Sequence, residues 1–133
     1  MSQIPIDQVL ISLENDSIHQ SPCIYMSPNV TVVRPADILD NNKAISFRCQ
    51  IIEGAKEASM VLVDLSQVTF IDSSGLGALV LARKEVRNAG SQLYLCSLNH
   101  RLKILFELTS MDQIFDVFSD QEEFRRQYID HLG

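Results

Sequence analysis

The chain has 133 residues, 46% of them hydrophobic, and a formal net charge of −6 at pH 7. Its length and apolar content suit a single domain with one core, and its acidic balance argues against direct binding to nucleic-acid phosphates. No apolar run approaches the roughly 20 residues that a membrane-spanning helix needs, and the N-terminus lacks a basic stretch ahead of an apolar one. We therefore expect a cytoplasmic protein that does not associate with membranes.

The first 22 residues differ in character from the rest of the chain. An apolar run at 9–13 has the composition of a strand, but a polar stretch rich in turn-forming residues follows it. We expect residues 1–22 to be a loosely attached, flexible N-terminal extension and residues 23–133 to form the folded domain.

The folded domain is expected to begin with a hairpin and a helix. Residues 23–26 and 30–33 are rich in β-forming residues and are separated by Ser-Pro-Asn, which predicts a short hairpin. Asp40 then suits the N-cap of a helix whose end is marked near Gly54. The apolar positions of this helix recur at one-face spacing: Ala44, Phe47 and Ile51.

A buried strand followed by a helix that starts at two serines is the most informative stretch. Residues 61–65 are apolar and β-rich, a short loop follows, and a helical pattern begins at Ser73 and Ser74. Because backbone N–H groups at a helix N-terminus lack intrahelical partners, a hydroxyl there either caps the helix or carries an anion.

This helix is expected to have two faces with different roles. Helical rotation predicts one face that packs on the sheet, made of Gly75, Ala78, Leu79, Ala82, Val86 and Ala89. A second, exposed face lies beside Ser73 and carries Leu76, Val80, Arg83, Lys84 and Arg87. An exposed apolar pair next to a modifiable hydroxyl indicates a partner surface.

The last third of the chain alternates again between strand and helix patterns. Residues 92–97 predict a strand, and Asn99 suits the N-cap of a short helix that carries Leu102, Leu105 and Phe106. Residues 114–118 alternate like a final strand, and 119–122 have capping-box spacing ahead of a terminal helix with Phe124, Tyr128 and Leu132. Together these elements predict an α/β fold with a mixed, largely parallel sheet packed against helices.

The segment Phe-Ile-Asp-Ser-Ser-Gly-Leu-Gly at 70–77 lies between the strand at 61–65 and Ala-Gly-Ser-Gln-Leu-Tyr-Leu at 89–95. This arrangement resembles the anti-sigma-factor antagonist family of STAS domains over roughly residues 30–124. In that family the first serine after the aspartate is phosphorylated, and that position is Ser73 here. The resemblance implies a STAS-like fold, a partner that is both a serine kinase and an anti-sigma factor, and a PP2C-type phosphatase that reverses the modification.

The family also has an acidic residue at the end of an early strand, in a Gly-x-Leu-Asp pattern. Asp40 matches the aspartate, whereas Asp37 stands where the pattern has glycine, which adopts a positive φ more readily. We expect Asp40 and Asp72 to cluster near Ser73, with solvated surface acids as the alternative. The expected partner-binding residues are Asp40, Asp72, Ser74, Gly75, Leu76, Gly77 and Val80.

The sequence gives catalysis little support. A Gly-x-Ser-x-Gly nucleophile elbow on Ser73 would need glycine at Ile71, and no Walker motif, dinucleotide fingerprint or paired-histidine metal spacing is present. His19, His100 and His131 fit surface or capping positions, and Cys23, Cys49 and Cys96 fit small core residues in a reducing compartment. We therefore expect no enzyme, no metal and no cofactor.

The hypothesis that follows is a binding switch in transcription regulation. Unphosphorylated, the chain would bind the kinase/anti-sigma factor, and phosphorylation of Ser73 would add negative charge at the interface and inactivate it. Two alternatives stay open. One is a STAS scaffold or adaptor subunit of another signalling or transport assembly, and the other is a small hydrolase or nucleotide-binding domain.

Overall fold

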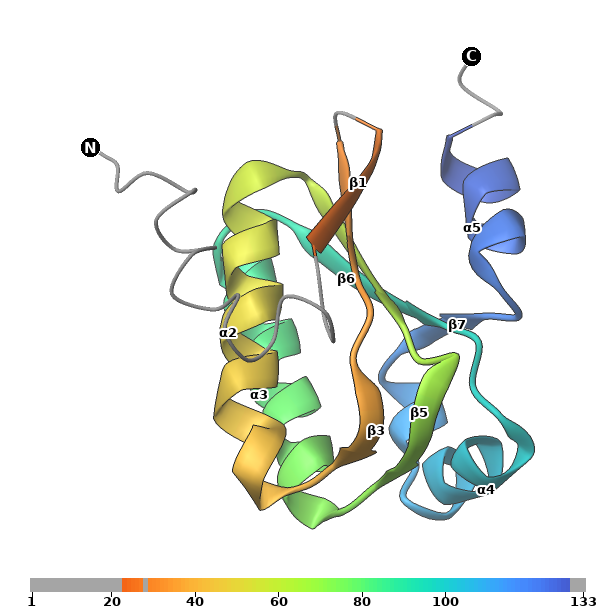
Figure 1. The fold of residues 1–133 in the computed structure, drawn as a ribbon. Coiled ribbons are helices and arrows are strands. Elements are labelled where there is room, and N and C mark those ends of the chain that lie inside the picture. Colours follow the sequence, from red (N-terminus) through yellow and green to blue (C-terminus); the bar gives the residue numbers. More distant parts are fainter. Residues whose placement is uncertain (1–22, 28, 130–133) are drawn as a thin grey trace.

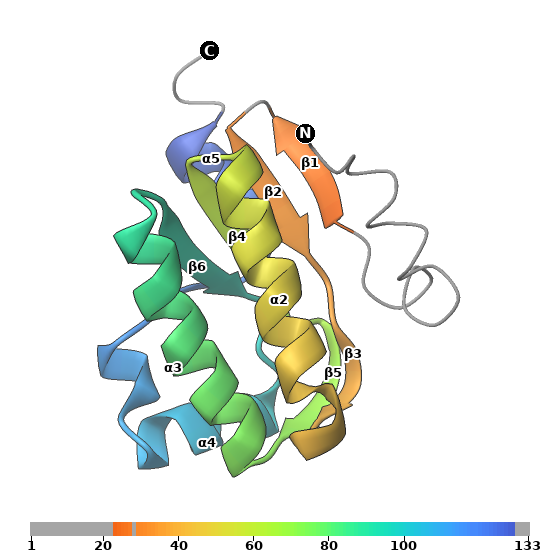
Figure 2. The same cartoon turned by 90° about the vertical axis from the view of Figure 1, so that its left-hand side faces the viewer.

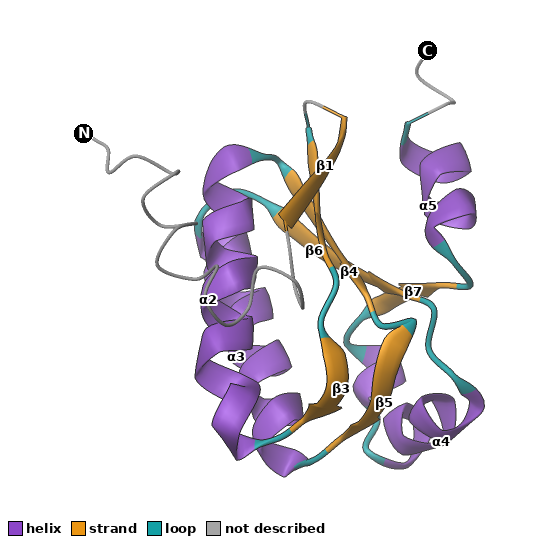
Figure 3. Ribbon diagram, in the orientation of Figure 1, coloured by secondary structure: helices purple, strands orange, loops and turns teal. Residues whose placement is uncertain are grey.

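A five-stranded mixed sheet forms the centre of the protein (Figures 1 and 3). The structure is a computed structural model that describes residues 23–27 and 29–129. In spatial order the strands are β1 (Cys23–Ser27), β2 (Val30–Val33), β4 (Met60–Asp64), β6 (Gln92–Cys96) and β7 (Asp116–Phe118). β1 is antiparallel to β2 and the other neighbours are parallel, so the predicted hairpin and the predicted mixed, largely parallel sheet are confirmed.

Two further strands form a separate parallel ribbon. The family pattern implied the first of them, which ends before Asp40, whereas the second was not predicted. β3 (Ala36–Leu39) continues the path of β2 after Arg34 and Pro35, and β5 (Gln67–Ile71) continues the path of β4 after a short turn. Proline has no N–H to donate to a ladder, which accounts for an interruption at Pro35. The segment that we interpreted as a loop after residue 65 therefore contains a strand, and the ribbon extends beyond the main sheet (Figure 1).

Helices cover both faces of the main sheet. α2 (Asn41–Glu57) and α3 (Ser73–Asn88) lie side by side on one face, and α5 (Gln121–Tyr128) lies on the other (Figures 1 and 2). α4 (His100–Leu108) and the short 3₁₀ helix η1 (Met111–Gln113) precede β7. No helix among residues 23–27 and 29–129 is long and apolar enough to cross a membrane.

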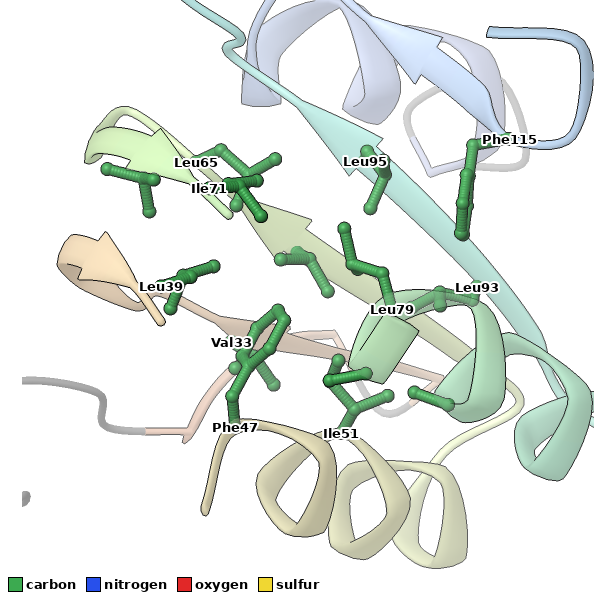
Figure 4. Packing of buried hydrophobic residues seen from close by; sticks show 14 of the residues in the cluster. Val33, Leu39, Phe47, Ile51, Leu65, Ile71, Leu79, Leu93, Leu95 and Phe115 are labelled. Carbon is green, nitrogen blue, oxygen red and sulfur yellow. The ribbon is translucent and has the colours of Figure 1, made fainter. Parts of the chain in front are cut away.

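Alternation along the strands sends side chains into two separate cores. On β4, Val61 and Val63 face the large core under α2 and α3, whereas Leu62 faces the smaller core under α5. Figure 4 shows the large core, in which Phe47 and Ile51 of α2 point toward the strands. Burial on both faces explains why this strand reads as a continuous apolar run.

The core under α5 is aromatic. Phe124 is fully buried, and its ring lies 5.4 Å from that of Tyr94 and 5.5 Å from that of Phe118. Burial raises the pKa of Tyr94 and of the Cys96 thiol to about 12, so Cys96 is an inert core residue, as expected. Cys49 is exposed on α2, and the expectation of a core position was wrong for that residue.

Several predicted helix boundaries are confirmed and two are corrected. The Oδ1 atom of Asn99 accepts a hydrogen bond from Leu102 N at 2.8 Å, which confirms the predicted cap of α4. α2 continues to residue 57 because Gly54 faces the sheet, where an added Cβ would lie 3.0 Å from Thr31 Cγ2. α5 is capped by Asp120 rather than by the residue before it. The predicted features at 1–22 and at residues 131 and 132 lie outside the described residues.

Asp37, which stands where the family pattern has glycine, adopts the left-handed conformation. Its φ is 62°, and the pairing of β3 with β5 is irregular between Asp37 and Ile38. Aspartate tolerates this region better than most residues but less well than glycine. With aspartate in place of glycine, the backbone still adopts a positive φ at position 37, at some cost in stability.

We expect Asp37→Gly to raise the free energy of unfolding by about 0.5 kcal/mol, because glycine removes the left-handed strain. Asp37→Ala is the matched control, since both variants lose the same 3.8 Å contact with Lys43 but alanine keeps the strain. Urea unfolding of the three proteins measures the difference. An Asp37→Ala protein at least as stable as Asp37→Gly would contradict a positive φ at this position.

Candidate functional site

Two helix N-termini lie next to each other at the end of the ribbon (Figures 1 and 2). Leu39 and Ile71 are paired at the ends of β3 and β5, and Asp72 N donates a hydrogen bond to Leu39 O at 3.1 Å. Asp40 and Asp72 each follow one member of that pair, and α2 and α3 then begin. The strand pairing thus places the two aspartates at the starts of neighbouring helices, and their grouping around Ser73 stays a prediction.

Both aspartates act as N-caps. Asp40 Oδ1 accepts a hydrogen bond from Asn42 N, and Asp72 Oδ1 accepts one from Gly75 N, each at 3.0 Å. A carboxylate at this position satisfies a backbone N–H that has no partner within the helix and complements the positive end of the dipole. The cap of α3 is thus Asp72, which corrects the idea that Ser73 or Ser74 performs this role.

Ser73 is the exposed first residue of α3, and Ser74 is half-buried behind it. Because Asp72 already caps the helix, capping does not account for the hydroxyl of Ser73. An exposed hydroxyl at the positive end of a helix is accessible to a modifying enzyme, and a phosphate there would lie near backbone N–H groups as well as near the carboxylate of Asp72.

The structure corrects the predicted exposure of Leu76 and Val80. Leu76 is 8% exposed and belongs to the large core, and Val80 is half-buried against the same core. The prediction assumed that α3 buries one face only, against the sheet. Leu102 and Phe106 of α4 belong to the same cluster, so the large core extends past the sheet and includes the face of α3 that we expected to be free.

The exposed stripe of α3 lies next to the predicted one. Ser73, Gly77 and Lys84 are exposed, and Leu81 is 49% exposed at its edge. The residues expected to pack on the sheet are buried, except Ala89, which follows the helix end. Leu81 was missed, although its four-residue spacing from Gly77 would have placed it on this stripe.

The two glycines near Ser73 have different structural roles. A Cβ on Gly75 would collide with the carbonyl oxygen of Leu39 and would lie 2.7 Å from Ile71 Cγ2. No atom of the described chain lies within 4 Å of the Cβ position on Gly77. Gly75 thus permits the close approach of α3 to the ribbon, whereas the fold does not require glycine at Gly77.

An ion pair joins α2 to α3. Arg48 Nε lies 2.8 Å from Glu85 Oε1 and Arg48 Nη2 lies 3.1 Å from Glu85 Oε2, a bidentate geometry. The hydrogen bond lowers the pKa of Glu85 and raises the pKa of Arg48, so both groups stay charged near neutral pH. The pair links the two helices that start beside Ser73.

The remaining groups offer little chemistry at this site. His100 is the exposed first residue of α4. Within the described ranges 23–27 and 29–129, no three His, Cys, Asp or Glu side chains are grouped so as to hold a metal ion. The site therefore brings together an exposed hydroxyl, two capping carboxylates and a helix surface.

Known proteins are similar to this chain in sequence and in fold. The sequence profile of the STAS domain matches residues 21–124. An anti-sigma-B factor antagonist of Listeria monocytogenes is 40% identical over 62 residues, which are 47% of this chain and 54% of that protein, so the chain spans about half the length of this relative. An anti-sigma-B factor antagonist of Bacillus subtilis is 29% identical over 99 residues, which are 74% of this chain and 91% of that protein.

The fold is also shared with a solved protein of low sequence identity. The anti-sigma factor antagonist SpoIIAA of Bacillus, in its unphosphorylated form, superposes with a TM-score of 0.65 at 16% identity and covers 80% of this chain and 94% of its own. This likeness confirms the predicted STAS-like α/β fold. The profile match shows that the chain belongs to the STAS domain family, in which its relatives are anti-sigma factor antagonists.

Proposed function

We propose that the chain is a phosphorylation-switched anti-sigma factor antagonist. In its unphosphorylated form it binds a partner that is both a serine kinase and an anti-sigma factor, which then releases its sigma factor. The kinase inactivates the chain by phosphorylating Ser73, and a PP2C-type phosphatase restores it. The observation that carries the proposal is the exposed hydroxyl of Ser73 on the first residue of α3, in a chain whose relatives are named anti-sigma-B factor antagonists.

The local charges explain how one phosphate would act as a switch. Phosphorylation adds roughly −1.5 to −2 charge at neutral pH beside the carboxylate of Asp72, with Asp40 capping the neighbouring helix. Within the free domain, the N-terminus of α3 offsets part of this charge. A partner surface matched to a neutral hydroxyl cannot offset it, so the complex loses complementarity without a large rearrangement of the domain.

The expected partner-binding residues divide into two groups by burial. Asp40, Asp72 and Ser74 are half-buried and Gly77 is exposed, so each is open to direct contact with a partner. Gly75 and Leu76 are buried, and Val80 is half-buried against the core. We propose that these last three support the interface by holding α3 in place.

Titration with the anti-sigma factor encoded in the same genome tests the proposal. Unphosphorylated protein and Ser73→Ala are expected to bind, and the enzymatically phosphorylated protein is expected to bind at least about 100-fold more weakly. Ser73→Asp is expected to lose part of the affinity, because aspartate carries less charge and fewer acceptor oxygens than phosphate. Calorimetry or fluorescence anisotropy measures all four affinities.

Ser74→Ala is the matched control for the modified position. Incubation with the kinase and ATP, followed by phosphopeptide mapping, is expected to locate the phosphate on Ser73 in the wild type and in Ser74→Ala, and to find none in Ser73→Ala. Phosphate on Ser74 in a Ser73→Ala protein that is modified at the normal rate would refute the assignment. Equal affinities of the phosphorylated and unphosphorylated proteins would refute the switch.

A further inference from the structure

The outward sides of α2 and α3 form one surface next to Ser73. Both helices begin at the paired ends of β3 and β5 and run in the same direction (Figure 2). The Arg48–Glu85 ion pair joins them. Ile45 precedes Arg48 by three residues and Leu81 precedes Glu85 by four, which are same-face spacings. Ile45 and Leu81 therefore lie on the same side of the helix pair, about one turn nearer to the helix N-termini than the ion pair.

Both of these apolar side chains are exposed. Ile45 is 72% exposed and Leu81 is 49% exposed. Leu81 shares the exposed stripe of α3 with Ser73, Gly77 and Lys84. A single exposed apolar side chain is ordinary, but one on each of two packed helices, beside a proposed modification site, is typical of a partner surface. We define Ile45, Gly77, Leu81 and Lys84 as the helix-pair surface.

Gly77 is a second feature that the fold leaves unexplained. Glycine is the poorest helix-forming residue apart from proline, and Gly77 lies within an exposed part of α3 where an alanine Cβ would meet no atom of the described chain within 4 Å. A position without a side chain exposes the helix backbone to close approach from outside. On the stripe that it shares with Leu81 and Lys84, Gly77 lies about one turn before Leu81, so it leaves the helix backbone open at the end of the surface nearest Ser73.

Charge is the third feature of this surface. α2 and α3 carry six of the eleven Lys and Arg residues of the chain, but three of its seventeen Asp and Glu residues. The two helices are therefore basic in a protein whose net charge is −6. Lys84 is exposed three residues after Leu81, so a basic side chain borders the apolar ones, whereas Arg48 is paired with Glu85. The complementary surface on a partner is acidic.

We propose that the helix-pair surface binds a protein partner that presents acidic side chains around an apolar pocket, and that this partner is the anti-sigma factor. The identity of the partner rests on the proposed function, whereas its chemistry follows from the surface itself. Leu81 and Ile45 fill the pocket, Lys84 meets carboxylates at its edge, and the partner approaches the backbone at Gly77. A nucleic acid would use the positive charge but would leave the two apolar side chains without a counterpart.

Matched substitutions on α3 and α4 test the apolar and charged parts of the surface. Leu81→Ala and Lys84→Glu are each expected to weaken binding to the purified anti-sigma factor by about tenfold or more. Leu108→Ala and Lys103→Glu make the same chemical changes on the exposed side of α4, where Leu108 is 79% exposed, and are expected to bind like the wild type. The loss caused by Lys84→Glu is expected to shrink at high salt, and the loss caused by Leu81→Ala is not.

Gly77→Ala gives a test in which stability and binding change in opposite directions. Replacing an exposed helical glycine is expected to raise the midpoint of thermal unfolding by about 2–5 °C. The added methyl group blocks the close approach, so affinity for the anti-sigma factor is expected to fall by about tenfold or more. A Gly77→Ala protein that is more stable and binds normally would overturn the role of this position and of the surface around it.

The outcomes separate this inference from the proposed function. If phosphorylation of Ser73 abolishes binding but Leu81→Ala, Lys84→Glu and Gly77→Ala all bind like the wild type, the switch stands and the helix-pair surface is overturned. If the wild type does not bind the anti-sigma factor, both are overturned. Binding of duplex DNA or of anionic vesicles that is lost in Lys84→Glu but kept in Leu81→Ala would also overturn the inference.

Discussion

Gly75→Ala is expected to lower the free energy of unfolding by about 2–3 kcal/mol. The added Cβ would collide with the carbonyl oxygen of Leu39, which is backbone and cannot rotate away, and would lie 3.1 Å from Leu39 Cβ. Relief requires α3 to move away from the ribbon, which also displaces Asp72 and Ser73. Chemical denaturation measures the stability, and titration with the anti-sigma factor is expected to show weaker binding by the folded protein.

Gly77→Ala is the matched control, two residues further along the same helix. Its Cβ has open space, so the substitution is expected to stabilise the protein by about 0.5–1 kcal/mol. The two glycine substitutions thus have opposite signs, although helix propensity alone predicts that both stabilise. A Gly75→Ala protein as stable as Gly77→Ala would show that α3 does not pack on the ribbon as closely as described.

Leu76→Ala is expected to cost about 2–4 kcal/mol of stability, because Leu76 is 8% exposed and belongs to the core between the sheet, α3 and α4. Leu81→Ala is the matched control on the same helix, and its cost is expected to stay within about 0.5 kcal/mol. Thermal unfolding and partner titration on the same samples separate the roles of the two leucines.

We expect Leu76 to contribute to the stability of the fold and Leu81 to contribute to affinity for the partner. After correction for the folded fraction, Leu76→Ala is expected to bind with nearly normal affinity and Leu81→Ala to bind weakly. The reverse pattern, a stable Leu76→Ala with poor affinity, would restore Leu76 as the exposed partner anchor that the sequence indicated. It would also mean that the large core does not extend over that face of α3.

Local sequence signals predicted most of the framework. The caps at Asp40 and Asn99 were recognised because a side-chain acceptor directly precedes an apolar pattern with helical spacing. The central strands were recognised from β-rich apolar runs, and the motif at 70–77 correctly located the start of α3. Each of these signals lies within a few residues of the feature that it predicts.

The errors concern contacts between segments that are distant in sequence. β5 was interpreted as a loop, because it pairs with β3, a segment distant in sequence, and no local pattern reveals that pairing. Leu76 and Val80 form an amphipathic stripe of their own, and whether that stripe is buried depends on segments that are distant in sequence. Gly54 looked like a helix end because its real constraint, contact with Thr31, comes from another element.

Strand order in the main sheet has a consequence for folding during synthesis. In space the five strands follow their order in the chain, since each crossover returns to the same growing edge. As the ribosome releases the chain, β4 can add to the completed β1–β2 hairpin, β6 to β4 and β7 to β6. No strand of the described sheet has to insert between two that are already paired. The last one, β7, has three residues, and so short an edge gives other nascent chains little to pair with.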